Sequence, residues 1–110
     1  MDGMDWILEN VAVGSWRDAS NQSLLEFENV GAILNVRSDE NEASKKEANE
    51  RVEEYCSIHN IEYCYIPLKN VTTATDSQFV SGIAFIERNI ESGRNVLVHC
   101  GDGMAAHLHL

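Results

Sequence analysis

The sequence predicts an α/β domain in which a mostly parallel central sheet is flanked by helices. Apolar runs rich in β-branched residues alternate with segments of helical periodicity over most of the chain, an order typical of parallel sheets. The chain has 110 residues, of which 44% are hydrophobic and 24% charged. That length and composition are those of one globular domain, so we expect residues 1–110 to form a single domain.

The first part of the chain is expected to form two strands and a short helix. Residues 6–9 and 11–14 predict strands on either side of Glu9–Asn10. Residues 18–21 offer helix N-cap side chains, and the helix that follows is expected to end at Gly31. The apolar face of this helix is formed by Leu24, Leu25 and Phe27.

The second part of the chain alternates strands and longer helices. Residues 32–36 predict a buried strand and residues 61–68 a further strand rich in β-branched and aromatic residues, with a helix over 43–60 between them. A further helix is expected to be capped by Thr75 or Asp76 and to end at Gly93, before a last strand over 95–99. The predicted core positions of this helix are Phe79, Ile83, Ile86 and Ile90.

Charge and cysteine content limit the class of partner. The net charge of −10 disfavours binding to nucleic acid or to anionic lipid, and no apolar run approaches the 18 residues of a membrane span. Three cysteines without metal-like spacing indicate reduced thiols in an intracellular compartment. We therefore expect a protein of the cytoplasm, with the nucleus as the alternative, that has no cofactor and no metal.

The clearest chemical signal is the strand that ends in His99–Cys100 and opens into a turn containing Gly101 and Gly103. A cysteine nucleophile acts as a thiolate, whose charge is stabilised by backbone N–H groups converging in such a turn. Ligands of parallel sheets bind beyond the carboxyl ends of the strands. Cys100 is therefore the candidate nucleophile.

Four segments together resemble the dual-specificity protein phosphatases, which are cysteine-dependent members of the protein tyrosine phosphatase superfamily. They are residues 13–21 (VGSWRDASN), 33–36 (ILNV), 65–68 (YIPL) and 96–100 (VLVHC). The resemblance extends over roughly residues 6–104 and implies the fold of that family.

The resemblance also implies an activity, the hydrolysis of phosphotyrosine and phosphoserine or phosphothreonine through a cysteinyl-phosphate on Cys100. The implied partner is a phosphorylated protein substrate or a phosphoprotein. The residues implied to form the phosphate-binding loop are His99, Gly101, Asp102, Gly103, Met104, Ala105 and Ala106.

Two departures from the family pattern predict weak or absent activity. Ala106 stands where the family has the loop arginine, next to Ala105 in place of a hydroxyl residue; comparable arginines contribute about 10³–10⁵ in rate. Asn70 stands where the family has its general acid, and an amide cannot supply that proton. Asp76 is the nearest replacement acid, although a helix-cap role suits it as well.

The third departure is length, because the family continues with helices that cover one sheet face, whereas few residues follow the loop here. We therefore expect an incomplete domain that is destabilised or that self-associates through an uncovered sheet face. The alternative function is a noncatalytic pseudophosphatase or truncated isoform that acts through protein contacts.

Other interpretations of the same residues carry less weight. His99, Cys100, His107 and His109 lack the ligand spacing of a zinc site. A disulfide between Cys64 and Cys100 competes with an ordinary buried strand cysteine at position 64.

The missing arginine leaves one question open. Arg17 and Arg37 are alternatives for a phosphate-binding arginine, but the spacing favours neither. Asp102 would add negative charge where a phosphate would bind.

Overall fold

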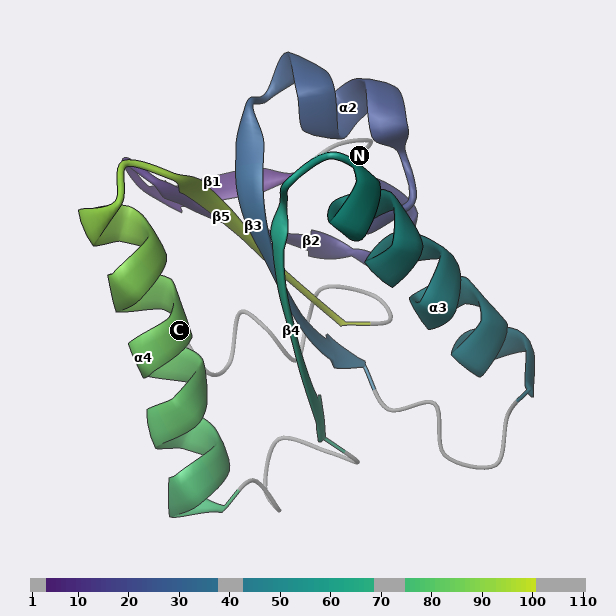
Figure 1. Ribbon diagram of the computed structural model, residues 1–110. Helices are drawn as coiled ribbons and strands as arrows, with labels where there is room; N and C mark the ends of the chain where they lie inside the picture. Colours follow the sequence, from purple (N-terminus) through teal and green to yellow (C-terminus); the bar gives the residue numbers. More distant parts are fainter. Residues whose placement is uncertain (1–3, 38–42, 69–74, 101–110) are drawn as a thin grey trace.

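The computed structural model describes residues 4–37, 43–68 and 75–100. Within them, helices cover both faces of a five-stranded sheet (Figure 1), which confirms the predicted α/β fold. The elements in chain order are β1 (Asp5–Leu8), β2 (Val11–Ser15), α1 (Trp16–Ala19), α2 (Gln22–Phe27), β3 (Val30–Arg37), α3 (Ala43–Ile58), β4 (Glu62–Leu68), α4 (Asp76–Glu91) and β5 (Asn95–Cys100).

The strand order is β1-β2-β5-β3-β4, and β5 lies in the middle of the sheet. β5 runs parallel to both β2 and β3, β3 runs parallel to β4, and only β1 is antiparallel to its neighbour. The carboxyl ends of four parallel strands therefore meet at one edge. We call this the carboxyl edge; its strands end at Ser15, Arg37, Leu68 and Cys100.

The two faces of the sheet carry separate apolar clusters. We call them the α4 face, against which α4 packs, and the α1–α3 face, which is covered by the other three helices (Figure 1). The buried cluster of the α4 face comprises Val11, Val13, Ala32, Leu34, Val36, Phe85, Ile86, Val96, Val98 and Cys100. That of the α1–α3 face comprises Met4, Ala12, Ala19, Leu25, Val30, Ile33, Val52, Cys56 and Leu97.

α4 buries only part of the predicted stripe: Ile86 is buried and Ile90 packs against the α4 face cluster, as expected. Phe79 and Ile83 are 43% and 39% exposed, so their assignment to the core was wrong. The buried side of the helix runs along Gly82, Phe85, Ile86 and Asn89. Gly82 lies on this buried side, where a Cβ would make ordinary van der Waals contact with Leu34 at 3.6 Å.

α2 also differs from its prediction. It ends at Phe27 rather than at Gly31, and the left-handed residue after it is Asn29, with φ of 56°. Asparagine tolerates this conformation better than most residues, so Gly31 is not needed as a helix stop and lies inside β3. Phe27 is 84% exposed and does not join the core, whereas Leu25 is buried.

The helices of the described ranges are too short or too polar to cross a membrane.

Candidate functional site

Cys100 is the last residue of β5, in the centre of the carboxyl edge, where it pairs with Ser15 of β2. Alternation along β5 turns Val96, Val98 and Cys100 to the α4 face. The Cys100 side chain is only 4% exposed. Its place at the end of the predicted strand is therefore observed, while its role as nucleophile stays a prediction.

His99 faces the opposite side of the sheet and is fully buried, with 1% exposure. Its Nδ1 lies 3.3 Å from the carbonyl oxygen of Cys100. Because a carbonyl can only accept, Nδ1 must carry the proton in this contact, which leaves Nε2 as an acceptor. Nε2 has no hydrogen-bond partner among the described residues.

Burial lowers the pKa of His99 to about 4. The hydrogen bond to the Cys100 carbonyl raises that pKa, the positive charge of Arg37 lowers it, and the Asp18 carboxylate raises it. The imidazole is therefore neutral at pH 7 and orients the backbone at Cys100 as a hydrogen-bond donor.

The turn from β2 into α1 is held by Asp18. Its Oδ2 accepts hydrogen bonds from the backbone N–H of Ser15 at 2.8 Å and from the Ser15 hydroxyl at 3.3 Å. A Cβ at Gly14 would lie 2.6 Å from the same oxygen, so residue 14 must be glycine for this cap to form. The cap starts α1 at the carboxyl edge and fixes Trp16 there.

Arg37 ends β3 at the same edge and lies against Trp16. Its Cζ is 5.0 Å from the centre of the indole ring, the same distance as the Cζ of Arg17. The Arg37 Nη1 is buried and has no partner in the described part of the chain. Both groups are within the usual range of cation–π contact.

A hydrogen-bonded chain supports the end of β3. The fully buried Asn35 accepts from the backbone N–H of Arg37 at 2.8 Å and donates to the hydroxyl of Tyr63 at 3.0 Å. Burial raises the pKa of Tyr63 to about 12, although the bond from Asn35 lowers it. Sequence reasoning missed Trp16 and Asn35 as site residues; their position inside the matching segments 13–21 and 33–36 was the signal.

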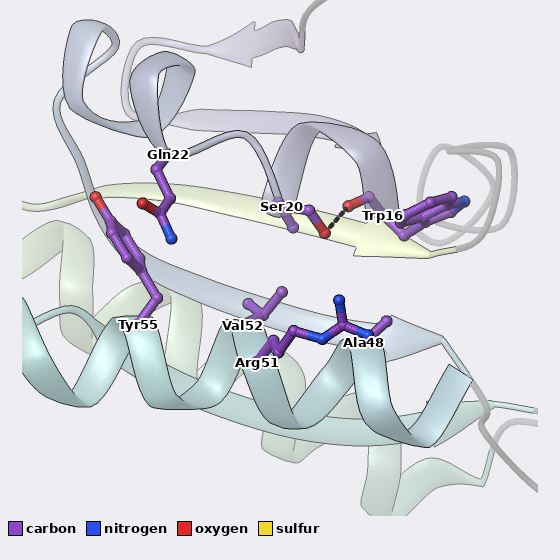
Figure 2. Close-up of a pocket in the computed structure, with 8 residues that line it drawn as sticks. Trp16, Ser20, Gln22, Ala48, Arg51, Val52 and Tyr55 are labelled. Carbon is purple, nitrogen blue, oxygen red and sulfur yellow. Dashed lines mark hydrogen bonds between the residues drawn. The ribbon is translucent and has the colours of Figure 1, made fainter. Parts of the chain in front are cut away.

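A pocket of about 200 Å³ opens beside Trp16, between α1 and α2 on one side and α3 on the other (Figure 2). The Ser20 hydroxyl donates to the carbonyl of Trp16 at 2.8 Å and closes the upper wall. The pocket is thus distinct from Cys100 but shares Trp16 with the carboxyl edge. Its lining is Trp16, Ala19, Ser20, Gln22, Ala48, Arg51, Val52 and Tyr55.

The candidate acid Asp76 is exposed at the first residue of α4. Thr75, not Asp76, is the N-cap, and it forms a capping box with Gln78. Gln78 Nε2 also donates to the carbonyl of Pro67 at 3.4 Å, which brings the start of α4 to the carboxyl end of β4. The acid role of Asp76 stays a prediction.

The strand register decides against a disulfide between Cys64 and Cys100. Leu34 of β3 pairs with Cys64 on one side and with Val98 on the other. Two strand spacings put Cys64 about 10 Å from β5, beyond the roughly 7 Å that a disulfide spans. Cys64 is half-buried against the α4 face cluster, and burial raises its pKa.

The remaining predicted site residues lie outside the described ranges. They are Asn70, Gly101, Asp102, Gly103, Met104, Ala105 and Ala106, together with His107 and His109 of the less favoured zinc alternative. Within the described ranges, no cluster of three or more His, Cys, Asp or Glu side chains could hold a metal ion.

Solved structures of phosphatases share this fold. DUSP15 superposes with a TM-score of 0.71 at 21% identity, over 94% of this chain and 58% of its own. Human DUSP28 gives 0.67 at 17% identity, over 94% and 62%. A DUF442 protein from Shewanella putrefaciens CN-32 gives 0.67 at 16% identity, over 99% and 65%. The resemblance to dual-specificity phosphatases inferred from the sequence is therefore confirmed for the fold.

The chain spans about 58 to 65% of the length of these solved structures. Comparisons of the sequence with models of protein families and with curated proteins find no match.

Proposed function

We propose that this chain binds phosphate monoesters at the carboxyl edge of its sheet and hydrolyses them through Cys100 weakly or not at all. The observation that carries the proposal is the place of Cys100 at the end of the central strand β5, in a fold shared with dual-specificity phosphatases. The implied substrate class is phosphotyrosine or phosphoserine and phosphothreonine in a protein.

The reaction would follow the usual course of a cysteine phosphatase. The Cys100 thiolate forms a bond to phosphorus while the bond to the leaving oxygen breaks and that oxygen takes up a proton. Water then displaces the thiolate and releases inorganic phosphate. Ala106 and Asn70 replace the arginine and the acid that normally stabilise these steps, which supports weak turnover.

A noncatalytic role is the second candidate, and the burial of Cys100 favours it. A nucleophile must reach its phosphorus atom, yet this side chain is 4% exposed and packs with aliphatic residues. A pseudophosphatase, or a truncated isoform, would bind a phosphoprotein and leave it intact. Either role suits a protein of the cytoplasm or the nucleus that binds neither nucleic acid nor membrane.

Hydrolysis of 4-nitrophenyl phosphate by the purified chain tests the proposal, with Cys100→Ser as the matched control. Turnover that exceeds the control identifies a weak enzyme and excludes the noncatalytic role. Turnover equal to the control, together with retained binding of phosphate, identifies the noncatalytic role. Failure to bind phosphate monoesters at all refutes both.

A second variant tests which departure from the family pattern limits the rate of hydrolysis. Ala106→Arg restores the residue that the family carries in its loop and should raise the rate strongly if this position is the main defect. Little recovery would point instead to another departure, such as Asn70 in place of the acid.

A further inference from the structure

We propose that the pocket between α1, α2 and α3 is a docking site for a partner protein, which inserts one aromatic side chain flanked by carboxylates. The pocket lies on the α1–α3 face, whereas Cys100 is turned to the α4 face. The inference therefore goes beyond the proposed function and holds whether or not Cys100 reacts. The occupant is an acidic segment of the partner with a central aromatic residue.

The pocket has an apolar floor between two aromatic ends. Ala19 and Val52 are 2% and 6% exposed and belong to the buried cluster of the α1–α3 face. Trp16 and Tyr55 are half-buried and lie at opposite ends of the pocket (Figure 2). The Tyr55 ring packs against His59, with the ring centres 4.2 Å apart. Walls that are ordered before binding reduce the entropy lost on binding.

The rim of the pocket is polar. Ser20, Gln22 and Arg51 line the pocket and are exposed. The Ser20 hydroxyl donates to the carbonyl of Trp16 at 2.8 Å, so its oxygen remains available as an acceptor. An apolar floor within a polar rim is the usual arrangement where one protein takes up an anchoring side chain of another.

The volume of the pocket limits what can enter it. About 200 Å³ is less than the roughly 300–1,000 Å³ of pockets that enclose a drug-sized ligand. It suits one large side chain, and aromatic residues are the common anchors of protein interfaces. Trp16 and Tyr55 can both make ring contacts with such a side chain, and contacts of this kind stabilise beyond the area that they bury.

The charge at the Trp16 end favours an acidic partner. The chain has 18 acidic and 8 basic residues, yet Arg51 is the one charged side chain among the described residues that line the pocket. Its guanidinium points toward the Trp16 end (Figure 2). The Cζ atoms of Arg17 and Arg37 each lie 5.0 Å from the centre of a Trp16 ring. Three positive charges therefore gather around this end.

Arg51 is available to a carboxylate of the partner. It pairs with Glu47 at 3.7 Å, and the two side chains are 74% and 71% exposed. That distance exceeds the usual N–H···O hydrogen bond of about 2.7–3.2 Å, and exposed pairs contribute little to stability. Asp18, the carboxylate of α1, already accepts from the backbone and hydroxyl of Ser15. An acidic partner therefore disrupts no strong ion pair at this end.

The test uses Trp16 as its reporter. The sequence has two tryptophans, Trp6 and Trp16, so Trp6→Phe leaves the second as the sole source of indole fluorescence. Three tripeptides, acetylated and amidated at their ends, are titrated into the full chain: Glu-Phe-Glu, Glu-Ala-Glu and Lys-Phe-Lys. Sodium chloride at about 0.15 M screens the net charge of the chain. The first peptide has both proposed determinants, and each of the others lacks one.

We expect a saturable change in Trp16 fluorescence with Glu-Phe-Glu. The midpoint should be about 10- to 100-fold higher for Glu-Ala-Glu, because that peptide inserts no ring into the pocket. It should be about threefold higher or more for Lys-Phe-Lys, because the pairing with Arg51 is replaced by repulsion.

Two pairs of variants on α3 locate the binding site. Ala48→Leu fills the pocket, keeps a good helix former and should weaken binding of Glu-Phe-Glu at least about tenfold. Ala43→Leu, at the exposed start of the same helix, is its matched control and should bind as the wild type does. Arg51→Gln should weaken binding about two- to fivefold, whereas the exposed Lys46→Gln, which removes the same charge outside the pocket, should not.

The inference is overturned if Glu-Phe-Glu gives no saturable response, if Glu-Ala-Glu binds equally well, or if Ala48→Leu binds as Ala43→Leu does. Equal or tighter binding of Lys-Phe-Lys overturns the acidic partner. If Ala48→Leu does not fold, Arg51→Gln and the three peptides still decide. The peptides carry no phosphate, and Cys100→Ser should bind them as the wild type does, so failure of this test leaves the proposed function untouched.

Discussion

The two faces of the sheet bury similar apolar clusters, but a buried polar residue on each face differs in its hydrogen bonding. The polar residue buried under the α4 face, Asn89, bonds to the Phe85 carbonyl at 2.9 Å and to Arg94 at 3.3 Å. The α1–α3 face ends in His99, which keeps an unpartnered ring nitrogen in the described part of the chain. Satisfied polar groups fasten elements together, whereas the buried His99 nitrogen lacks a partner that the described residues could supply.

The largest expected loss of stability comes from truncating a buried apolar side chain, and it should be similar on the two faces. Phe85→Ala on the α4 face and Leu97→Ala on the α1–α3 face each remove a buried side chain. Each should lower the free energy of unfolding by about 2–5 kcal/mol. Urea denaturation followed by circular dichroism measures this, with the exposed Glu87→Ala as control. A loss below about 1 kcal/mol at one site would show that the two faces are not packed alike.

The pH dependence of stability should come from the α1–α3 face. The pKa of His99 is about 4 in the folded chain, against 6.5 for an unperturbed histidine. The unfolded chain therefore binds the proton more readily, so this contribution is complete above pH 6.5 and is lost as the pH falls toward 4. The loss is about 3 kcal/mol.

Urea denaturation between pH 4 and 7 tests this, because His99→Gln lacks the titrating group and should show a smaller slope of stability against pH. Equal slopes in the two proteins would contradict the assignment.

Breaking the hydrogen bonds that join Asn35 to Arg37 and Tyr63 should have the next largest effect on stability. Asn35→Ala leaves the backbone N–H of Arg37 and the hydroxyl of Tyr63 without their partner, at a cost of about 1–3 kcal/mol. The pKa of Tyr63, already raised to about 12, should rise further, because the lost bond lowered it. Ultraviolet titration of the phenolate near 295 nm follows that change.

A double-mutant cycle sharpens the result. If the two side chains interact as the structure shows, Asn35→Ala should cost less stability in a Tyr63→Phe background than in the wild type. Strict additivity would argue that they act independently.

The smallest effect on stability is expected on the outer side of α4. Phe79, Val80 and Ile83 are 43%, 65% and 39% exposed, so Val80→Ser and Ile83→Ser should change stability by about 0.5 kcal/mol or less. If the chain self-associates through these exposed side chains of α4, and not through the sheet face expected from the sequence, the same variants should shift sedimentation equilibrium toward the monomer. Unchanged association would place the contact elsewhere.

The sequence predicted the sheet well because strand and helix periodicities are local signals. It did not predict the whole stripe of α4 that faces the sheet, since Gly82 and Asn89 have no hydrophobic signature and yet lie on the buried side of the helix. Nor could spacing show that Arg37, and not Arg17, has a buried guanidinium nitrogen. That difference depends on contacts between residues far apart in the chain.

The central place of β5 has a consequence for how this chain folds. β2 and β3 do not pair with each other, and each pairs with β5, which comes last in chain order among the described strands. Val11 and its partner Val96 are separated by most of the sequence, and such long-range pairing is slow because a large loop must close first. During synthesis, the two halves of the sheet therefore remain unjoined until the segment that carries Cys100 has been made.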